Sequence, residues 1–205
     1  MIGANGMKTM RNFTALAALG LALGGCISLG SEPPESLITL SPIAGASGDA
    51  AMTGTSNAGA IAVLTPEVPA KLNVTRVPVH VSDTEIAYLQ DAVWVEKPSR
   101  LFRRLLGETL RMRGAGLVLD TEDTPTVATR YVRGTLLDMG YDAPSSSVVV
   151  RFDAMRTEES GAVTARRFEA RESGIAPDAA SVAPALNRAA NRVAGEVADW
   201  VIGGA

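Results

Sequence analysis

Cys26 is the only thiol in the 205-residue chain, and the residues before it are typical of an exported protein. Two basic residues, Lys8 and Arg11, precede an uncharged run from Phe13 to Leu23 that ends in a pair of glycines. A basic start, a short apolar stretch and small residues before a cleavage point predict a signal peptide over residues 1–25. The apolar stretch is about eleven residues long, well below the roughly 20 that span a bilayer as a helix. We therefore expect no retained membrane helix.

The sequence Leu23-Gly24-Gly25-Cys26 resembles a bacterial lipobox. The resemblance implies that the Cys26 sulfur takes a diacylglyceryl group, that cleavage falls before it, and that the new amine is acylated, commonly with palmitate. Each buried methylene contributes about 0.8 kcal/mol and about two chains suffice for stable attachment, so Cys26 would hold the protein at a membrane. Ile27 is not the aspartate that commonly retains enteric lipoproteins in the inner membrane, which favours the outer membrane. The alternative is an unmodified cysteine in a cleaved leader.

The other reactive side chains form no recognisable catalytic motif. His80 is the only histidine, and neither a G-x-S-x-G sequence nor a histidine-containing metal motif accompanies it. Glu158 and Glu159 could act as acid and base, but adjacent strand residues point to opposite faces, and charges in a turn are solvated. The Gly-rich segment 45–59 is not followed by the Gly-Lys-Ser/Thr of a phosphate loop. We expect no enzyme activity, no metal and no cofactor.

Charge and length restrict the partners and the number of domains. Acidic residues (22) outnumber basic residues (19), so nothing favours nucleic acid as a partner. Without its leader the chain is long enough for one domain with a substantial core. We expect a lipidated tether at 26–35, which reaches at most about 30 Å when extended, and a single domain at 36–205. Within that domain, residues 45–60 are small or polar apart from one Met, which predicts a mobile loop.

Hydrophobic patterns predict the secondary structure of the domain. Short apolar and β-branched runs predict strands at residues 36–40, 61–64, 76–81, 86–90, 117–119, 129–139, 147–156 and 162–171. The last two strands flank a polar turn at 157–161, which is typical of a β-hairpin. Apolar residues at helical spacing predict one helix from Pro98 to a stop at Gly114 and another from Ser181 to Ile202. With Ser181 as N-cap, Pro184 would fall in the first turn, where its missing N–H is not required.

The two helices are amphipathic, so each must bury its apolar face. Leu105 and Val193 lie in the middle of these faces and should be in the core, whereas Arg103 and Arg104 should lie on the solvated exterior. Strands in hairpin-like succession with two helices predict an α+β fold, in which an antiparallel sheet carries both amphipathic helices packed on one face.

The strand at 76–81 is the candidate contact with a partner protein. Pro78 cannot donate a ladder hydrogen bond and places this strand at a sheet edge. Val77, Val79 and Val81 share one face of it. An edge strand with such a face can accept a partner strand by main-chain hydrogen bonds.

Several landmarks then follow the lipobox in a recognisable order. They are Leu37-Ile38-Thr39-Leu40, Ile61-Ala62-Val63, Arg76-Val77-Pro78-Val79, Ile86-Ala87-Tyr88-Leu89, and Trp94, Glu96 and Pro98 before the Leu-rich helix. This order is similar to that of the ABC-type transport auxiliary lipoprotein component family, the outer-membrane lipoprotein of Pqi- and Mce-type intermembrane lipid transport systems. The resemblance covers nearly all of the mature chain.

The resemblance implies a non-enzymatic accessory on the periplasmic face of the outer membrane. Its partners would be the membrane, through the lipid anchor, and the MCE-type substrate-binding and permease/ATPase subunits of a transporter. The sequence leaves a homo-oligomer open as well. It also permits a second function, that of a structural or assembly lipoprotein of the outer envelope with no transport role.

Overall fold

The computed structural model describes residues 36–43, 59–119 and 128–203. Residues 36–205 group as one compact unit. The predicted signal peptide and tether, with Cys26, lie outside the described residues, as does most of the predicted loop at 45–60. Among the described helices, none is long and apolar enough to cross a membrane.

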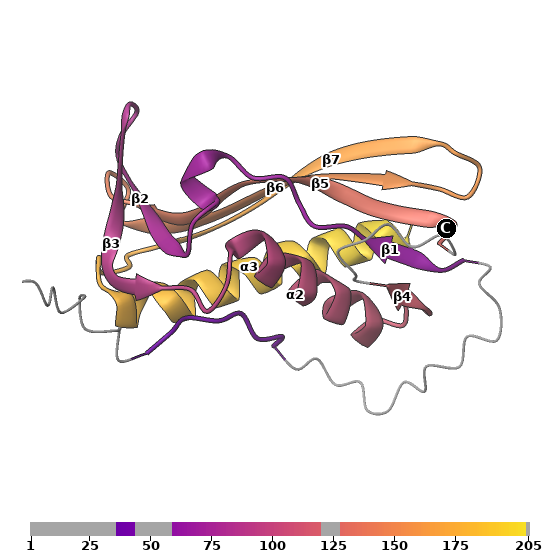
Figure 1. Ribbon diagram of the computed structural model, residues 1–205, viewed down its shortest axis with the longest axis horizontal. Helices are drawn as coiled ribbons and strands as arrows, with labels where there is room; N and C mark the ends of the chain where they lie inside the picture. Colours follow the sequence, from indigo (N-terminus) through magenta and orange to yellow (C-terminus); the bar gives the residue numbers. More distant parts are fainter. Residues whose placement is uncertain (1–35, 44–58, 120–127, 204–205) are drawn as a thin grey trace, which may run out of the picture. The chain divides into compact units, whose positions relative to one another are not determined.

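In the described residues, seven strands form one sheet, with two long helices beside it (Figure 1). The strands are β1 (Ile61–Val63), β2 (Arg76–Ser82), β3 (Glu85–Val93), β4 (Val118–Leu119), β5 (Arg130–Asp142), β6 (Ser147–Thr157) and β7 (Val163–Ser173). The helices are α2 (Pro98–Met112) and α3 (Ala179–Ile202), and a short 3-10 turn, η1 (Ala70–Leu72), precedes β2.

Strand β5 organises the sheet because it has neighbours on both sides. On one side it pairs antiparallel with β6, which pairs antiparallel with β7. On the other side its start pairs parallel with β1 and its end pairs parallel with β2. β4 continues the sheet beyond β1, and β3 continues it beyond β2. The edge strands β3 and β7 therefore lie on opposite sides of the described sheet.

The α+β class is confirmed, and the sheet is mixed rather than antiparallel throughout. Parallel neighbours need a crossover of a dozen or more residues, and the chain between β2 and β5 supplies one that contains α2. The predicted strand at 36–40 forms only a single bridge, between Ile38 and Trp94. β6 and β7 match the predicted hairpin and are each one residue longer than expected, while β5 is two residues longer.

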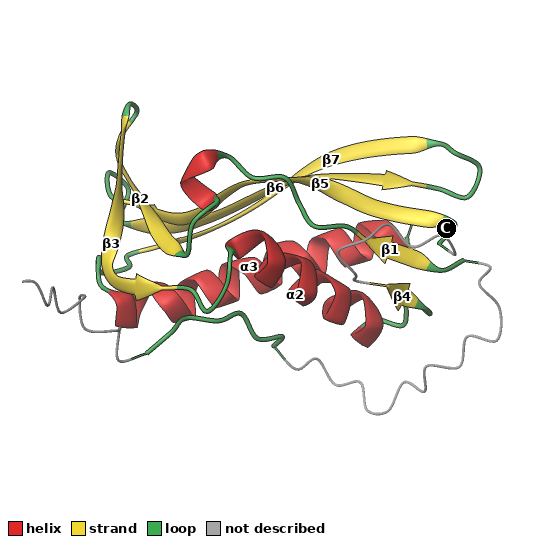
Figure 2. Ribbon diagram, in the orientation of Figure 1, coloured by secondary structure: helices red, strands yellow, loops and turns green. Residues whose placement is uncertain are grey.

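Both helices lie on one face of the sheet, as predicted (Figure 2). Leu105 and Val193 are buried in the core between helices and strands. The ring centroids of Phe102 on α2 and Phe152 on β6 are 5.1 Å apart, so α2 contacts the sheet directly. Full burial of side chains of this kind contributes about 1.5–3 kcal/mol each. The core thus occupies the layer between the sheet and the two helices.

Two local expectations for the helices are wrong. Arg103 is buried rather than solvated, because ten of the 15 residues of α2 are buried and the buried arc is wider than the apolar stripe. Helix α3 begins earlier than predicted, since the Asp178 carboxylate caps it by accepting the Ser181 N–H at 2.8 Å. Pro184 therefore lies in the second turn, where one main-chain hydrogen bond is lost.

Candidate functional site

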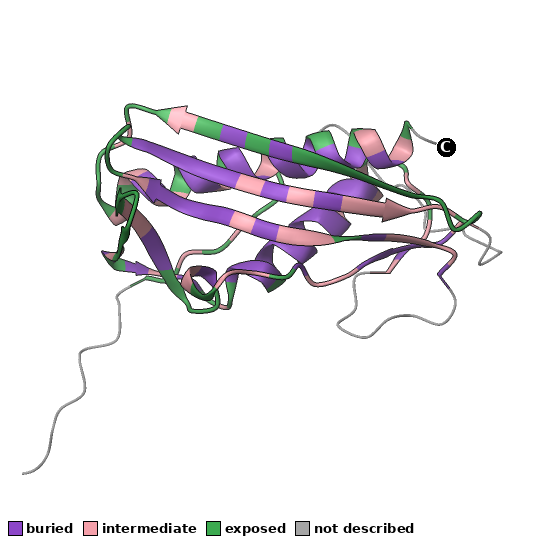
Figure 3. Ribbon diagram, turned by 90° about the horizontal axis from the view of Figure 1, so that it is seen from above, coloured by how far each residue is buried: buried purple, intermediate pink, exposed green. Residues whose placement is uncertain are grey.

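The face of the sheet opposite the helices, which we call the open face, carries most of the charged side chains of β5, β6 and β7. Figure 3 views the sheet from this side, with the helices behind it. Alternation along β6 places Val150 and Phe152 in the core and Arg151 and Asp153 on the open face. The 3-10 turn η1 contacts the charges of this face through Lys71.

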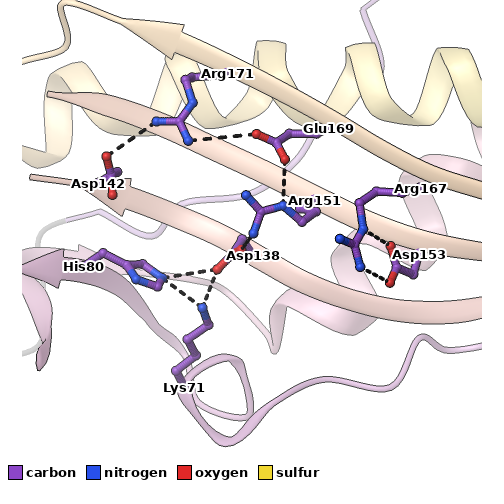
Figure 4. A network of polar contacts seen from close by, with 9 residues as sticks. All are labelled: Lys71, His80, Asp138, Asp142, Arg151, Asp153, Arg167, Glu169 and Arg171. Carbon is purple, nitrogen blue, oxygen red and sulfur yellow. Dashed lines mark hydrogen bonds and ion pairs between the residues drawn. The ribbon is translucent and has the colours of Figure 1, made fainter. Parts of the chain in front are cut away.

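A chain of ion pairs crosses the open face from η1 to β7 (Figure 4). Asp138 on β5 pairs with Lys71 of η1 and with Arg151 Nη1 at 2.6 Å. Arg151 Nε donates to Glu169 on β7 at 2.7 Å. The members are opposite one another in the strand register, Asp138 facing Arg151 and Arg151 facing Glu169. The chain therefore ties three strands and η1 together on the side that lacks helices.

Hydrogen bonds shift the pKa values of several groups on this face. The hydrogen bond to Glu169 raises the pKa of Arg151 above its ordinary value, and the nearby Asp138 charge adds to it. The Ser145 hydroxyl lowers the pKa of the Asp142 carboxyl, with help from Arg171. Two hydrogen bonds from Arg167, at 2.6 and 2.7 Å, lower the pKa of Asp153. All these groups are ionised at neutral pH.

His80 belongs to this network, and the described side chains that contact its ring nitrogen are Lys71 and Asp138 rather than a hydroxyl or a thiol. Its Nε2 lies 2.8 Å from Lys71 Nζ and 3.2 Å from Asp138 Oδ1. Lys71 Nζ can only donate and Asp138 Oδ1 can only accept, so the tautomer of the ring decides which of the two contacts is a hydrogen bond. Within the described segments, no group of three or more His, Cys, Asp or Glu side chains is placed to hold a metal.

The hollows near these residues are small or open. The one beside His80 encloses about 110 Å³ between Asp138, Gly140 and Arg171, below the roughly 300–1,000 Å³ of ligand pockets. Gly140 lines it, and a Cβ at this position would overlap the carbonyl of Pro78. A wider groove of about 520 Å³ runs over Thr135 and Ala165. This geometry fits a contact surface better than a catalytic cleft.

A third groove, of about 460 Å³, lies beside the helices and contains three arginines. Arg188 and Arg192 both bind the Glu172 carboxylate, at 2.7 and 3.2 Å. Arg113 pairs with Asp199. Each arginine of this groove is thus paired with a carboxylate, and two of the three share Glu172.

The predicted partner strand is paired on both sides, so the edge-strand expectation for β2 is wrong. β2 lies between β3 and the end of β5, and the edge strand is β3. Val77 is fully buried, Val79 is half-buried and Val81 is exposed. Contact of these three residues with a partner stays a prediction, and among them only Val81 is exposed.

Two of the remaining candidates have a defined place. Glu158 pairs with Arg130 at 3.1 Å and with Arg156 at 3.0 Å, and it lies at the end of the β6–β7 hairpin. Glu159 is exposed in the turn. The lipidation candidate, Cys26, precedes the first described residue. The charged open face was missed in the sequence, although opposite charges alternate along both predicted arms of the hairpin.

A family model for the ABC-type transport auxiliary lipoprotein component matches residues 39–198. The chain belongs to this family. Among solved structures it is similar to protein XCC0632 from Xanthomonas campestris, of family DUF330, with 17% identity and a TM-score of 0.65 over 82% of this chain and 95% of that one. An uncharacterised protein shows 12% identity and a TM-score of 0.62 over 81% and 99%. No curated protein matches the chain. These neighbours show that the fold is shared.

Proposed function

We propose that the protein is an outer-membrane-anchored periplasmic lipoprotein that serves as the non-enzymatic auxiliary component of an ABC/MCE-type intermembrane lipid transport system. The family match over residues 39–198 carries this proposal, since it covers almost the whole compact unit. The export leader and the lipobox-like sequence before Cys26 support attachment to a membrane. Ile27 supports the outer membrane as the place of attachment.

A docking role fits the chemistry of the described residues better than turnover does. Lys71 and Asp138 lie within 3.2 Å of His80 Nε2, and the adjoining hollow of about 110 Å³ is too small for a lipid. A transporter that delivers lipid across an aqueous gap needs a fixed receiver, and anchoring raises the effective concentration of a weak contact. The protein therefore acts as an anchored docking site, while the transporter drives the movement of lipid.

The β2–β3 hairpin is the docking element that we propose. Its turn projects beyond the neighbouring strands in Figure 1. Beside this turn, Val81 and Ile86 are 39% and 40% exposed. The edge strand β3 is uncharged from Ile86 to Gln90, whereas the other edge strand, β7, carries charges along its length. Charged edges resist strand addition and uncharged ones permit it, so a partner strand would add to β3.

Affinity purification of the acylated protein from native membranes, followed by mass spectrometry, tests the partnership. The wild type should recover a substrate-binding subunit and a permease of a lipid transporter. Ile86→Asp should reduce this recovery severalfold, whereas the matched control Val163→Asp, at a 50% exposed position of β7, should not. Recovery of no transporter subunit, while other envelope complexes survive, would instead favour a structural or assembly lipoprotein.

Attachment through Cys26 is tested separately from the partnership. Intact mass of the wild type should show a lipidated Cys26 as the first residue, and Cys26→Ala should leave the membrane fraction. If the wild type carries no lipid and the variant stays with the membrane, the anchoring claim is wrong whatever the pull-down recovers.

A further inference from the structure

Three exposed aliphatic side chains, Leu37, Val74 and Val95, form a patch where the described chain begins. They are 52%, 37% and 52% exposed. They come from three segments far apart in the sequence, and main-chain hydrogen bonds hold these segments side by side. We call them the anchor-side patch.

Main-chain pairing places the three side chains on the same side of the paired segments. Ile38 donates to the Val93 carbonyl at 2.7 Å and accepts from the Val95 N–H at 2.9 Å, which pairs Ile38 with the buried Trp94. Because side chains alternate along extended segments, Leu37 and Val95 point away from the core. Trp94 N–H also donates to Thr75 at 2.7 Å, and Arg76 pairs with Val93, so Val74 lies opposite Val95.

The segment that carries Leu37 is fixed to the domain at both ends. Besides its bridge to Trp94, its Ser41 and Ile43 N–H groups donate to the Asn187 and Asn191 side chains of α3, at 2.9 and 2.8 Å. It is the indigo segment beside the helices in Figure 1. The position and direction of Leu37 are therefore set by the fold.

The rim of the anchor-side patch is basic. Arg76 is exposed and lies over the ring of Tyr88, 5.2 Å from its centroid. Lys97 is exposed and donates to the neutral side chain of Asn73 at 2.9 Å. Neither cation forms an ion pair within the described part of the chain, so both charges are uncompensated there. Apolar side chains bordered by such cations are the pattern that phospholipid surfaces attract.

The chain itself limits how far this patch can be from the membrane. Leu37 comes eleven positions after Cys26, and an extended chain of that length spans at most about 40 Å. We propose that the anchor-side patch is the surface by which the domain lies against the phospholipid surface that holds its lipid anchor, with anionic headgroups meeting Arg76 and Lys97. Three half-exposed side chains would bind membranes weakly alone, but the anchor makes their contact intramolecular.

This proposal depends on acylation of Cys26 and not on the transport function. Contact with the membrane would fix the orientation of the domain and leave the turn of the β2–β3 hairpin, at Asp83 and Thr84, away from the bilayer. If the transport proposal fails, the anchor-side patch can still face lipid. If the patch does not face lipid, the protein can still serve the transporter.

Fluorescence quenching by brominated lipids tests the proposal in the full acylated protein. Acylation consumes the thiol of Cys26, so Val95→Cys offers a single site for an environment-sensitive dye. Val163→Cys is the matched control, because Val163 is 50% exposed and lies on β7. In phosphatidylethanolamine/phosphatidylglycerol vesicles we expect severalfold stronger quenching at position 95 than at position 163.

The charge part of the proposal is tested with Arg76→Glu combined with Lys97→Glu. This change should weaken quenching at position 95 in vesicles with phosphatidylglycerol and have less effect in vesicles without it. Leu37→Cys gives a second probe in case Val95→Cys disturbs folding, which denaturant unfolding would reveal. Equal quenching at positions 37, 95 and 163 overturns the proposal, as does crosslinking of position 95 to a protein instead of lipid in native membranes.

Discussion

Asp138 connects several charged side chains of the open face, a role that no sequence motif indicated. Its side chain is 12% exposed and receives both the Lys71 ammonium and the Arg151 guanidinium, while His80 lies 3.2 Å away. A buried carboxylate between two cations cannot be removed without leaving those cations poorly solvated. The residue therefore joins η1, β5 and β6 through charge rather than through apolar packing.

Asp138→Ala should destabilise the domain by about 1–3 kcal/mol, because Lys71 and Arg151 lose their shared acceptor. The control Asp83→Ala, in the exposed turn between β2 and β3, should change stability by less than about 0.5 kcal/mol. Urea unfolding of the non-acylated domain measures both. Equal effects at the two positions would show that the ion-pair chain does not stabilise the sheet.

Asp142 provides a pH test on the same face. The pKa of this carboxyl is lowered in the folded protein, first by the Ser145 hydroxyl, so its contribution to stability is complete above the unfolded value of about 3.9 and is lost as the pH falls through the folded value. Asp142→Asn should cost about 1 kcal/mol at pH 7 and progressively less below pH 4. A cost that does not change between pH 7 and pH 3, measured by denaturant unfolding, would contradict this assignment.

At the scale of elements, local patterns predicted the positions of strands and helices better than they predicted which strands pair in the sheet. The alternation in β6 and the helical spacing around Leu105 are local signals, and the structure confirms both. The parallel pairing of β5 with β1 and β2 depends on long crossovers that leave no local pattern. For the same reason the edge position that Pro78 indicated for β2 is wrong, because β2 pairs with both β3 and β5 and the free edge belongs to β3.

Burial of α2 is tested at Leu105. Leu105→Ala should cost about 2–5 kcal/mol, because it leaves a cavity between helix and sheet. Arg104→Ala is the control on the same helix, since the Arg104 side chain is 55% exposed and pairs with Glu96 at the surface, a contact worth about 0–1 kcal/mol. Arg103 is not a suitable control because it is buried. Similar midpoints in urea for both variants would mean that α2 does not pack on the sheet.

The join between β5 and β2 is tested at Gly140. A Cβ at this position would lie 2.8 Å from Pro78 Cγ and overlap the Pro78 carbonyl, so Gly140→Ala should cost about 1–3 kcal/mol by overpacking. In Gly195→Ala the added Cβ meets only the movable end of Arg113, and alanine gains about 1 kcal/mol of helix propensity. Thermal unfolding should therefore shift downward for the first variant and little or upward for the second.

At the scale of the whole molecule, the sequence was most informative about membership of the family and least informative about surfaces. The order of landmarks from Leu37 to Pro98 led to the family that the match over residues 39–198 confirms. Surfaces were harder because they depend on which segments lie side by side. Leu37, Val74 and Val95 are scattered in the sequence, and the pairing of Trp94 with Ile38 and with Thr75 brings them together.

The function that we propose for the domain uses two separate surfaces. The anchor-side patch faces the membrane and the β2–β3 hairpin meets the transporter. Since Leu37 and Val95 flank the end of β3 while Val81 and Ile86 flank its start, β3 connects the two surfaces. A domain with this arrangement can hold a docking strand at a fixed distance from the lipid surface.

The most direct measurement is transfer of labelled phospholipid between two vesicle populations. One population carries the purified transporter that the protein recovers from membranes, and the other carries the acylated protein through Cys26. We predict that transfer is faster than with the unanchored Cys26→Ala variant, and that it slows with Ile86→Asp but not with Val163→Asp. Transfer at the same rate with and without the acylated protein would contradict its function as the anchored receiver of a lipid transporter.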